Sequence, residues 1–413
     1  LVIVESPAKA KTINKYLGED YIVLASYGHV RDLPSKNGSV DTENNFNMTW
    51  EIDPGSKKPL KEIYDAAKDA KKIILATDPD REGEAIAWHV KNILDDKKLL
   101  KDKQVERVVF NEITKKAVKN GIDNPRSINT ELVDAYMARR ALDYLVGFNI
   151  SPILWTKLPG SKSAGRVQSV ALKLIVQREN EIELFKPEEY WSIQSLFKNK
   201  ENKDLNSKIT LFKSEKTNKF FFKNEEQTKS AVEEIKKHNF KITQIEKKPY
   251  KRNPYAPFTT STMQQEASKK LGFGASRTMQ VAQRLYQGFE IDGETVGLIT
   301  YMRTDGTQIS NEALQTCRTF IENKIGKEYL PEQARNYSGK KAKNAQEAHE
   351  AIRPTDINRE PVSLKSILDR DQMRLYELIW NRTVSSQMQS AEFERTSVDI
   401  YNSDKTIGFR ANG

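Results

Sequence analysis

Acidic side chains are concentrated in one short segment of the chain, "ATDPDREGEAIAWH", at residues 76–89. Four acids occupy seven consecutive positions there: Asp78, Asp80, Glu82 and Glu84. A further acid, Glu5, ends an apolar run at the N-terminus. Carboxylates that converge repel one another unless a cation neutralises them, and oxygen ligands select a hard ion. The pattern therefore predicts a Mg²⁺ site that can also bridge to phosphate.

A simpler interpretation of the same acids is that they begin a helix, where negative charge suits the helix dipole. This interpretation applies best to Glu84. Four acids in seven positions, together with Glu5 at the end of another expected strand, favour the metal site.

A second candidate for chemistry is Tyr301, in the segment "GLITYMRTDGTQIS" at residues 297–310. We expect Tyr301 to end a strand over residues 296–301, so that Arg303, two residues on, lies on the same face. A guanidinium group there would favour the phenolate and hold a phosphate group. A tyrosine in a strand is more often a packing residue. Spacing alone therefore does not identify a nucleophile.

The first 125 residues alternate strands and helices, which predicts a parallel α/β sheet. Ser6 and Pro7 begin a helix that ends at Gly18, and Thr114 caps a later one. Expected strands are residues 1–5, 21–27, 73–77 and 108–110, with a loop over 32–58 and a helix from about Gly83. Ligands bind beyond the carboxyl ends of such strands, where Glu5, Asp78 and Asp80 lie.

The remaining chain changes character twice. Helices are expected over residues 130–146 and from Arg166, and residues 190–250 alternate in a pattern typical of strands. Two helices follow over residues 259–288, the second capped by Ser276 and ended by Gly288. Further helices are expected over residues 308–325 and 363–390, and the alternating pattern returns over residues 397–409.

The composition limits the class of protein. The chain has 413 residues, 37% hydrophobic and 30% charged, without an apolar run long enough to span a membrane. Its single cysteine, Cys317, excludes an internal disulfide and a thiolate zinc cluster, which favours a reducing, cytoplasmic setting. A net charge of +10 suggests a polyanionic partner, although a Lys- and Asn-rich composition would give the same excess.

Three segments together resemble a known family. "LVIVESPAKAKTINKYLG" (residues 1–18) and residues 76–89 are similar to the Toprim catalytic domain of bacterial type IA DNA topoisomerases, the topoisomerase I group. Residues 297–310 are similar to the segment that carries the active-site tyrosine of that family. Toprim domains also occur in primases, nucleases and gyrase-type enzymes. The tyrosine segment is therefore what makes the resemblance specific.

The resemblance implies a reaction and roles. One DNA strand is cut through a 5′-phosphotyrosine link, another strand passes, and resealing needs no ATP, so negatively supercoiled DNA is relaxed. The implied catalytic residues are Tyr301 as nucleophile, Arg303 for charge on the phosphate, Glu5 as general acid and base, and Lys9 on the scissile phosphate. Mg²⁺ ligands would be Glu5, Asp78, Asp80 and Glu82, with no zinc bound by this chain. DNA contacts would come from Arg81, Arg107, Arg139, Asp143, Ser163, Arg166, Gln168, His29, His349 and Arg353.

The implied fold is a multidomain, toroidal core. Its expected parts are a Toprim domain at 1–125, a helical single-strand-binding domain at 126–185, a β-rich gate arch at 186–249, a helical domain with helix-turn-helix-like units carrying Tyr301 at 250–377, and a return into the arch at 378–413. The family core continues beyond this point, so we expect a fragment. The expected partner is DNA, for a monomer in the bacterial nucleoid.

Three other functions are compatible with parts of the sequence. A topoisomerase III-like decatenase would share the fold and the tyrosine. A Toprim nuclease or primase would use the acids while Tyr301 is only structural. A DNA-binding protein without catalysis would bind without Glu5, Asp78 and Asp80.

Overall fold

The computed structural model describes residues 1–198, 201–291, 293–337 and 350–413. The chain forms two compact units, each discontinuous in sequence. The first comprises residues 1–170 and 254–389, and the second comprises residues 171–253 and 390–413. In the part of the chain that is described, no helix is long and apolar enough to cross a membrane.

The first unit contains the predicted parallel sheet, with strand order β2-β1-β7-β8. Its strands are β1 Val2–Val4, β2 Val23–Ala25, β7 Lys72–Leu75 and β8 Gln104–Arg107. Val2, Ile3 and Val4 are all fully buried. Val2 and Val4 belong to one apolar core and Ile3 to another, because alternate residues of a strand point to opposite faces. Such burial on both faces is typical of parallel sheets.

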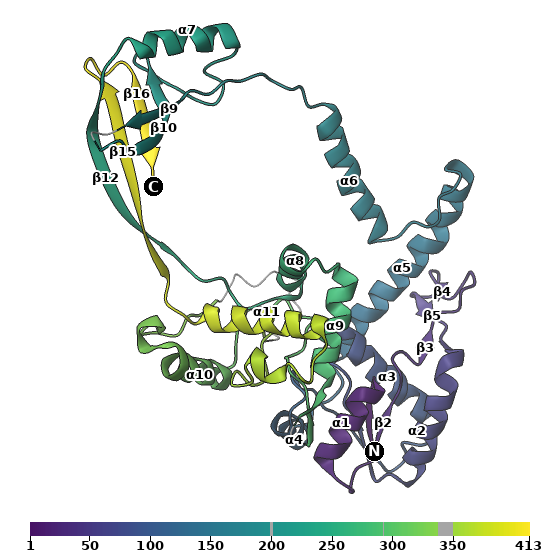
Figure 1. Cartoon of the computed structure of the whole chain (residues 1–413). Helices are drawn as coiled ribbons and strands as arrows, with labels where there is room; N and C mark the ends of the chain where they lie inside the picture. The colour runs from purple at the N-terminus through teal and green to yellow at the C-terminus, as the bar shows by residue number, and fades with distance from the viewer. Residues whose placement is uncertain (199–200, 292, 338–349) are drawn as a thin grey trace. The chain divides into compact units, whose positions relative to one another are not determined.

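Helices accompany this sheet: α1 Pro7–Leu17, α2 Lys57–Asp69, α3 Arg81–Asp96 and α4 Lys115–Asp123 (Figure 1). The Ser6 side chain caps α1, Gly18 ends it, and Thr114 caps α4, as predicted. The strand expected at residues 108–110 is instead β8, which ends at Arg107 with its ladder to β7.

The segment expected as a loop contains short strand pairs. β3 Arg31–Asp32 pairs with β6 Glu51–Ile52, and β4 Val40–Asp41 pairs with β5 Asn47–Met48. The 3-10 turn η1 spans Pro54–Ser56. Beyond the sheet, α5 spans Thr130–Lys157 and is longer than predicted, continuing through Pro152.

The same unit contains a second group of helices: α8 Thr260–Leu271, α9 Ala275–Gln287, α10 Asn311–Phe320 and α11 Arg370–Ser386. Short elements join them: the hairpin β13 Phe289–Ile291 and β14 Glu294–Val296, and the turns η2 Ile321–Ile325, η3 Lys327–Tyr329 and η4 Pro361–Leu364. The N-cap of α9 is Gly274 rather than Ser276, because the left-handed Gly272 ends α8 only two residues earlier.

The two regions of this unit share one apolar core. It joins Val2 and Ile74 of the sheet to Leu285 of α9, Tyr301 and Leu375 of α11. Residues 1–125 and 250–377, expected as separate domains, therefore pack together in this unit.

The second unit is built on an antiparallel sheet of order β11-β10-β16-β15-β12, with β9 paired to β10. Its elements are α6 Gln168–Glu183, which begins in the first unit, β9 Gln194–Lys198, β10 Asp204–Phe212, β11 Glu215–Lys216, α7 Glu225–Lys236, β12 Phe240–Arg252, β15 Ala391–Asn402 and β16 Gly408–Asn412. β12 and β15 form one long ribbon (Figure 1). The expected return at residue 378 falls inside α11, and the chain rejoins this unit at residue 390.

Candidate active site

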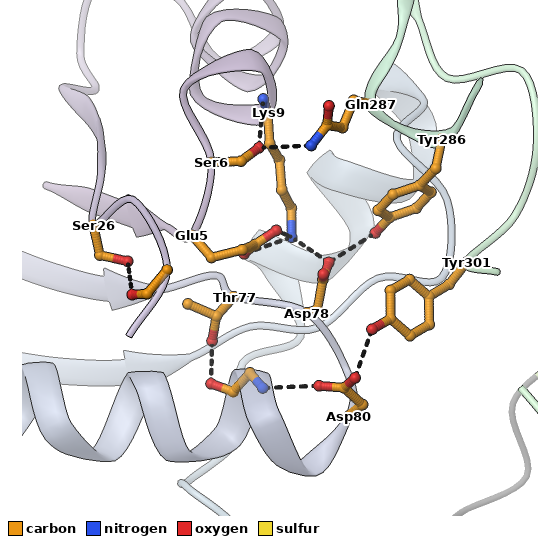
Figure 2. Close-up of polar contacts among 12 residues, drawn as sticks. Glu5, Ser6, Lys9, Ser26, Thr77, Asp78, Asp80, Tyr286, Gln287 and Tyr301 are labelled. Atoms are coloured by element: carbon orange, nitrogen blue, oxygen red, sulfur yellow. Dashed lines mark hydrogen bonds and ion pairs between the residues drawn. The ribbon is translucent and has the colours of Figure 1, made fainter. Parts of the chain in front are cut away.

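The first part of the site lies at the carboxyl ends of β1 and β7. Glu5 and Asp78 lie on opposite sides of Lys9 (Figure 2). Lys9 Nζ donates to both carboxylate oxygens of Glu5 at 3.2 Å and to Asp78 Oδ1 at 3.0 Å. Its side chain is only 1% exposed. The two acids converge as predicted, and the cation between them is a lysine of this chain.

The environment of Lys9 alters the proton affinity of its neighbours. Burial and the charge of Asp78 raise the pKa of Glu5 to about 7, although Lys9 opposes the shift. Burial would lower the pKa of Lys9, but the charges of Asp78 and Glu5 outweigh it and raise that pKa. Lys9 is therefore charged, and Glu5 takes up a proton more readily than an exposed glutamate.

Tyr301 forms the second part of the site. Its hydroxyl group donates to Asp80 Oδ2 at 2.7 Å, and the residue is 2% exposed (Figure 2). Arg303 Nη1 lies 3.7 Å from the same Asp80 oxygen, so both side chains reach one carboxylate. Burial, followed by the charges of Asp78 and Asp80, raises the pKa of Tyr301. In this arrangement Tyr301 is a neutral phenol, because Arg303 does not offset these effects.

The backbone around Tyr301 differs from the predicted strand. β14 ends at Val296, and the extended residues that follow are held by separate hydrogen bonds. Tyr301 N donates to Asn111 O at 2.8 Å, and Gly297 N donates to Ile113 O at 3.0 Å. A Cβ at Gly297 would lie 2.5 Å from the carbonyl oxygen of Tyr286, so only glycine fits. These bonds attach the tyrosine segment to the loop after β8, and no sheet ladder is required.

The loop that carries Asp78 and Asp80 is fixed by the start of α3. Asp80 is its N-cap, since Oδ1 accepts from Gly83 N at 2.8 Å, so the helix begins at Arg81 and not near Gly83. A Cβ at Gly83 would lie 2.1 Å from the carbonyl oxygen of Asp78. Asp80 thus has two bonded oxygens, one to the helix and one to Tyr301.

Arg107 departs from the expected DNA contact. It is 1% exposed, and its Nε donates to Glu84 Oε2 at 3.0 Å. Its other nitrogens donate to carbonyl oxygens that surround the end of β7: Leu75 at 3.0 Å, Thr77 at 2.9 Å and Asp78 at 2.7 Å. A strand of DNA cannot reach this guanidinium group. Arg107 instead holds the backbone that presents Asp78.

The sequence placed Glu84 at the start of a helix but did not foresee its buried ion pairs. It is fully buried and pairs with Arg107 and with Arg126, whose Nη1 lies 2.9 Å from its Oε1. Glu84 does lie in the first turn of α3, as the simpler interpretation expected, but its side chain is buried against two arginines. The sequence signal was its place next to Ala85 and Ile86 on the buried side of α3.

Several expected DNA contacts form two groups outside this core. Near the start of α3, Glu82 accepts from His29 Nε2 at 3.1 Å and lies 3.5 Å from Arg139 Nη1. Burial is outweighed there by the hydrogen bond from His29, which lowers the pKa of Glu82. Arg81 is the first residue of α3 and is partly exposed.

The second group joins α5 to the start of α6. Arg166 Nε donates to Asp143 Oδ1 at 2.8 Å, so Asp143 pairs with Arg166, although Arg139 lies one helical turn from it. Gln168 Nε2 is 3.4 Å from Ser163 Oγ. Four of the expected DNA contacts thus lie together where α5 and the start of α6 meet.

Arg353 also departs from the expected DNA contact. It is 6% exposed and pairs with Glu350 at 2.6 Å and Glu112 at 3.1 Å. Its backbone carbonyl accepts from Thr300 N at 2.9 Å, next to Tyr301. Arg353 therefore supports the tyrosine segment from inside. His349 lies outside the described residues.

The predicted Mg²⁺ ligands fit the ion by donor type, because all four are carboxylates. Within the described ranges, however, no three His, Cys, Asp or Glu side chains are gathered closely enough to hold a metal. Each predicted ligand has a protein partner instead: Lys9 for Glu5 and Asp78, Tyr301 for Asp80 and His29 for Glu82. A metal ion would have to replace some of these contacts.

The site thus combines acids at the carboxyl ends of a parallel sheet with a buried tyrosine from a separate group of helices. Residues 1–113 match the Toprim domain family, and residues 127–413 match the family described as DNA topoisomerase. The chain belongs to this DNA topoisomerase family, which confirms the resemblance.

Relatives of known name agree with this assignment. The chain is 53% identical over 414 residues to DNA topoisomerase 1 of Rickettsia bellii, covering all of this chain and 52% of that protein. It is 50% identical over 417 residues to DNA topoisomerase 1 of Xylella fastidiosa, covering 100% of this chain and 51% of the relative. The structure of full-length topoisomerase I from Thermotoga maritima matches with a TM-score of 0.84 and 38% identity, over 100% of this chain and 64% of that one. The chain thus spans about half the length of these curated relatives.

Proposed function

We propose that the protein containing this chain is a type IA DNA topoisomerase that relaxes negatively supercoiled DNA without ATP. One observation carries the proposal. The hydroxyl group of Tyr301 lies 2.7 Å from Asp80, a residue 221 positions away, inside the acid cluster of the Toprim domain. A nucleophile and acids brought together from such distant segments fit transesterification better than packing alone.

The chemistry follows from the groups at the site. Tyr301 Oη gives its proton to Asp80, the carboxylate that accepts its hydrogen bond, and attacks the phosphorus of one strand. The bond to the 3′ oxygen breaks, and a 5′-phosphotyrosine link remains. Glu5 donates the proton that the leaving 3′ oxygen requires, and Arg303 stabilises the charge that develops on the phosphate. Lys9 holds the Glu5 carboxyl group and supplies positive charge beside it. Reversal of these steps reseals the strand after another strand has passed.

We further propose that Mg²⁺ acts at this site. Toprim domains bind metal in general, and the candidate ligands are Asp78, Asp80, Glu82 and Glu5. When bound, the ion would neutralise the carboxylates and hold the phosphate backbone. Glu5 and Asp78 would then exchange their contacts with Lys9 for contacts with the ion, and Asp80 would exchange its contact with Tyr301.

The substrate proposed is single-stranded DNA or an unpaired region of negatively supercoiled DNA. The candidate contacts are the exposed and partly exposed groups Arg81, Arg139, Asp143, Ser163, Arg166, Gln168 and His29. A net charge of +10 is consistent with this partner. For the domains we propose the roles given by the sequence, with the Toprim domain at 1–125 and the tyrosine-bearing helices at 250–377. We also propose that the protein is a monomer and acts in the cytoplasm.

The decisive experiment uses a single-stranded oligonucleotide labelled at its 3′ end. After incubation and rapid denaturation, the label should migrate with the protein, and this adduct should be absent from Tyr301→Phe. Tyr376→Phe, another buried tyrosine of the same unit, is the matched control and should keep the adduct. A free labelled fragment that persists in Tyr301→Phe would instead establish a Toprim nuclease. A decatenation assay on full-length protein separates the topoisomerase III-like alternative.

A further inference from the structure

Tyr286 lies between the acid cluster and Tyr301. It belongs to the buried side of α9, and no function was assigned to it from the sequence. It is 0% exposed. Its hydroxyl group donates to Asp78 Oδ1 at 3.3 Å, on the side of Asp78 that faces Lys9 (Figure 2). Its ring packs edge-on against Tyr301, with centroids 5.4 Å apart and an interplanar angle of 65°.

These contacts give one side chain two functions. Asp78 Oδ1 accepts from both Lys9, at 3.0 Å, and Tyr286, so two donors define the orientation of this carboxylate. The edge-to-face contact favours one direction of the Tyr301 ring, the direction in which its hydroxyl group reaches Asp80.

The position of Tyr286 is itself fixed by the backbone. Leu298 N, in the tyrosine segment, donates to Leu285 O at 2.8 Å. On the other side, Gln287 Nε2 donates to Ser6 Oγ at 3.3 Å, at the start of α1. The last turn of α9 is thus bonded both to the segment that carries Tyr301 and to the helix that follows Glu5.

We propose that Tyr286 is a positioning residue for strand cleavage, which orients Asp78 through its hydroxyl group and Tyr301 through its ring. The inference rests on the proposed function for its role in cleavage. The positioning of Tyr301 is a property of the fold and is testable without DNA. A buried tyrosine that only fills space would be replaceable by phenylalanine without kinetic effect.

The first measurement is nitration of Tyr301 by tetranitromethane, followed by peptide mass spectrometry. In the unaltered chain both rings are buried, and reaction requires local opening. Tyr286→Leu removes the ring that covers Tyr301, and we expect nitration of Tyr301 about tenfold faster. Tyr376→Phe, which loses a buried hydroxyl bonded to Arg359 O at 2.7 Å, should leave it unchanged. Equal nitration in Tyr286→Leu and the unaltered chain would overturn the positioning of Tyr301.

The second measurement separates binding from cleavage in Tyr286→Phe. Removing a hydrogen bond to a charged group should lower the single-turnover rate of adduct formation by about tenfold or more. Affinity for the oligonucleotide should stay within about twofold, because the ring and the exposed contacts remain. A cleavage rate equal to that of Tyr376→Phe would overturn the role of the hydroxyl group. If full-length protein with the unaltered sequence forms no adduct, the proposed function fails, and nitration still decides the positioning.

Discussion

At the scale of single residues, the site is organised around cations that belong to the chain. Lys9 is buried between Glu5 and Asp78, where two carboxylates alone would repel each other. The sequence predicts a cation at this place, since acids at adjacent strand ends require one. It does not reveal that a helical residue four positions after Glu5 provides it.

Replacing Lys9 with methionine tests how much the folded state depends on this buried cation. Breaking a buried ion pair by removing one partner costs about 3–5 kcal/mol, so Lys9→Met should unfold well below the temperature of the unaltered chain. Mg²⁺ should restore part of the loss, because two unpaired carboxylates remain to bind it. Thermal unfolding with and without MgCl₂ measures both effects.

Lys11→Met is the matched control for this change. Lys11 lies on the same helix, but its side chain is 71% exposed and 3.9 Å from its acidic partner. The Lys11→Met variant should unfold at the same temperature as the unaltered chain, and Mg²⁺ should not stabilise it further. Equal protection of both variants would contradict the view that Lys9 occupies the position of a metal ion.

His89 supplies a pH dependence of stability. It is fully buried among Trp50, Trp88 and Tyr136, and its Nδ1 accepts from Arg31 Nε at 3.0 Å. Burial, followed by the charge of Arg31, lowers its pKa to about 3. An unfolded histidine titrates near 6.5, so the unfolded chain binds more protons between about pH 3 and 6.5. Stability is therefore lost as the pH falls through this window.

The expected contribution of His89 is at most about 1.4 kcal/mol per pH unit. His89→Gln, which keeps an acceptor for Arg31, should lose less stability than the unaltered chain between pH 6 and pH 4. Urea unfolding followed by tryptophan fluorescence reports on this region, because Trp50 and Trp88 pack on His89. His238→Gln in the second unit is the control. An unchanged pH profile in His89→Gln would refute the assignment.

At the scale of elements, the ends of β7 and β8 are held by a buried ion pair. Arg107 bonds to carbonyl oxygens at the end of β7 and to Glu84 on α3, so one side chain joins two strands and a helix. The loop with Asp78 is thereby fixed before any substrate binds. This arrangement supports a rigid acid cluster, which positioning of reactive groups requires.

Arg107→Lys should lower stability by about 3 kcal/mol, since lysine cannot satisfy the fork of acceptors around it. The salt dependence of single-stranded DNA binding should stay the same, because the residue does not reach solvent. Arg139→Ala should do the opposite and reduce the salt slope by about 0.7 with little loss of stability. Binding titrations at several salt concentrations distinguish the two variants. A reduced salt slope in Arg107→Lys would show that Arg107 does contact DNA.

Elements were predictable from the sequence where the determining interactions are local. Ser6 and Thr114 cap their helices through neighbouring backbone groups, and apolar runs identified β1 and β7. The prediction of a strand over residues 296–301 was wrong, because hydrogen bonds to distant segments hold these residues. The acids were found for the same local reason, whereas Glu84 and Tyr286 required knowledge of which side chains pack together.

At the scale of the whole molecule, both compact units are assembled from segments far apart in sequence. In the second unit, β15 and β16 lie between β10 and β12 in the sheet. Deleting residues 390–413 should therefore leave β10 and β12 without these partners and unfold this sheet, while the first unit keeps its site. Hydrogen exchange should lose protection over residues 194–252 and retain it over the parallel sheet.

A smaller deletion provides the control for that truncation. Removing residues 408–413 takes away β16 and preserves the long pairing of β12 with β15, so protection should persist over residues 240–252. Protection of that strand in the larger deletion as well would contradict the sheet order.

The place of β15 in the sheet also affects how the protein is made. About 140 residues separate the end of β12 from the start of β15, so at about 5–20 residues per second a ribosome needs roughly 7–30 seconds to supply the partner strand. During that interval the 13-residue β12 has neither of its edges paired, because β15 is its neighbour in the sheet. The ribbon that completes the second unit is thus a point of vulnerability during synthesis, where slow translation of the intervening helices would favour aggregation over folding.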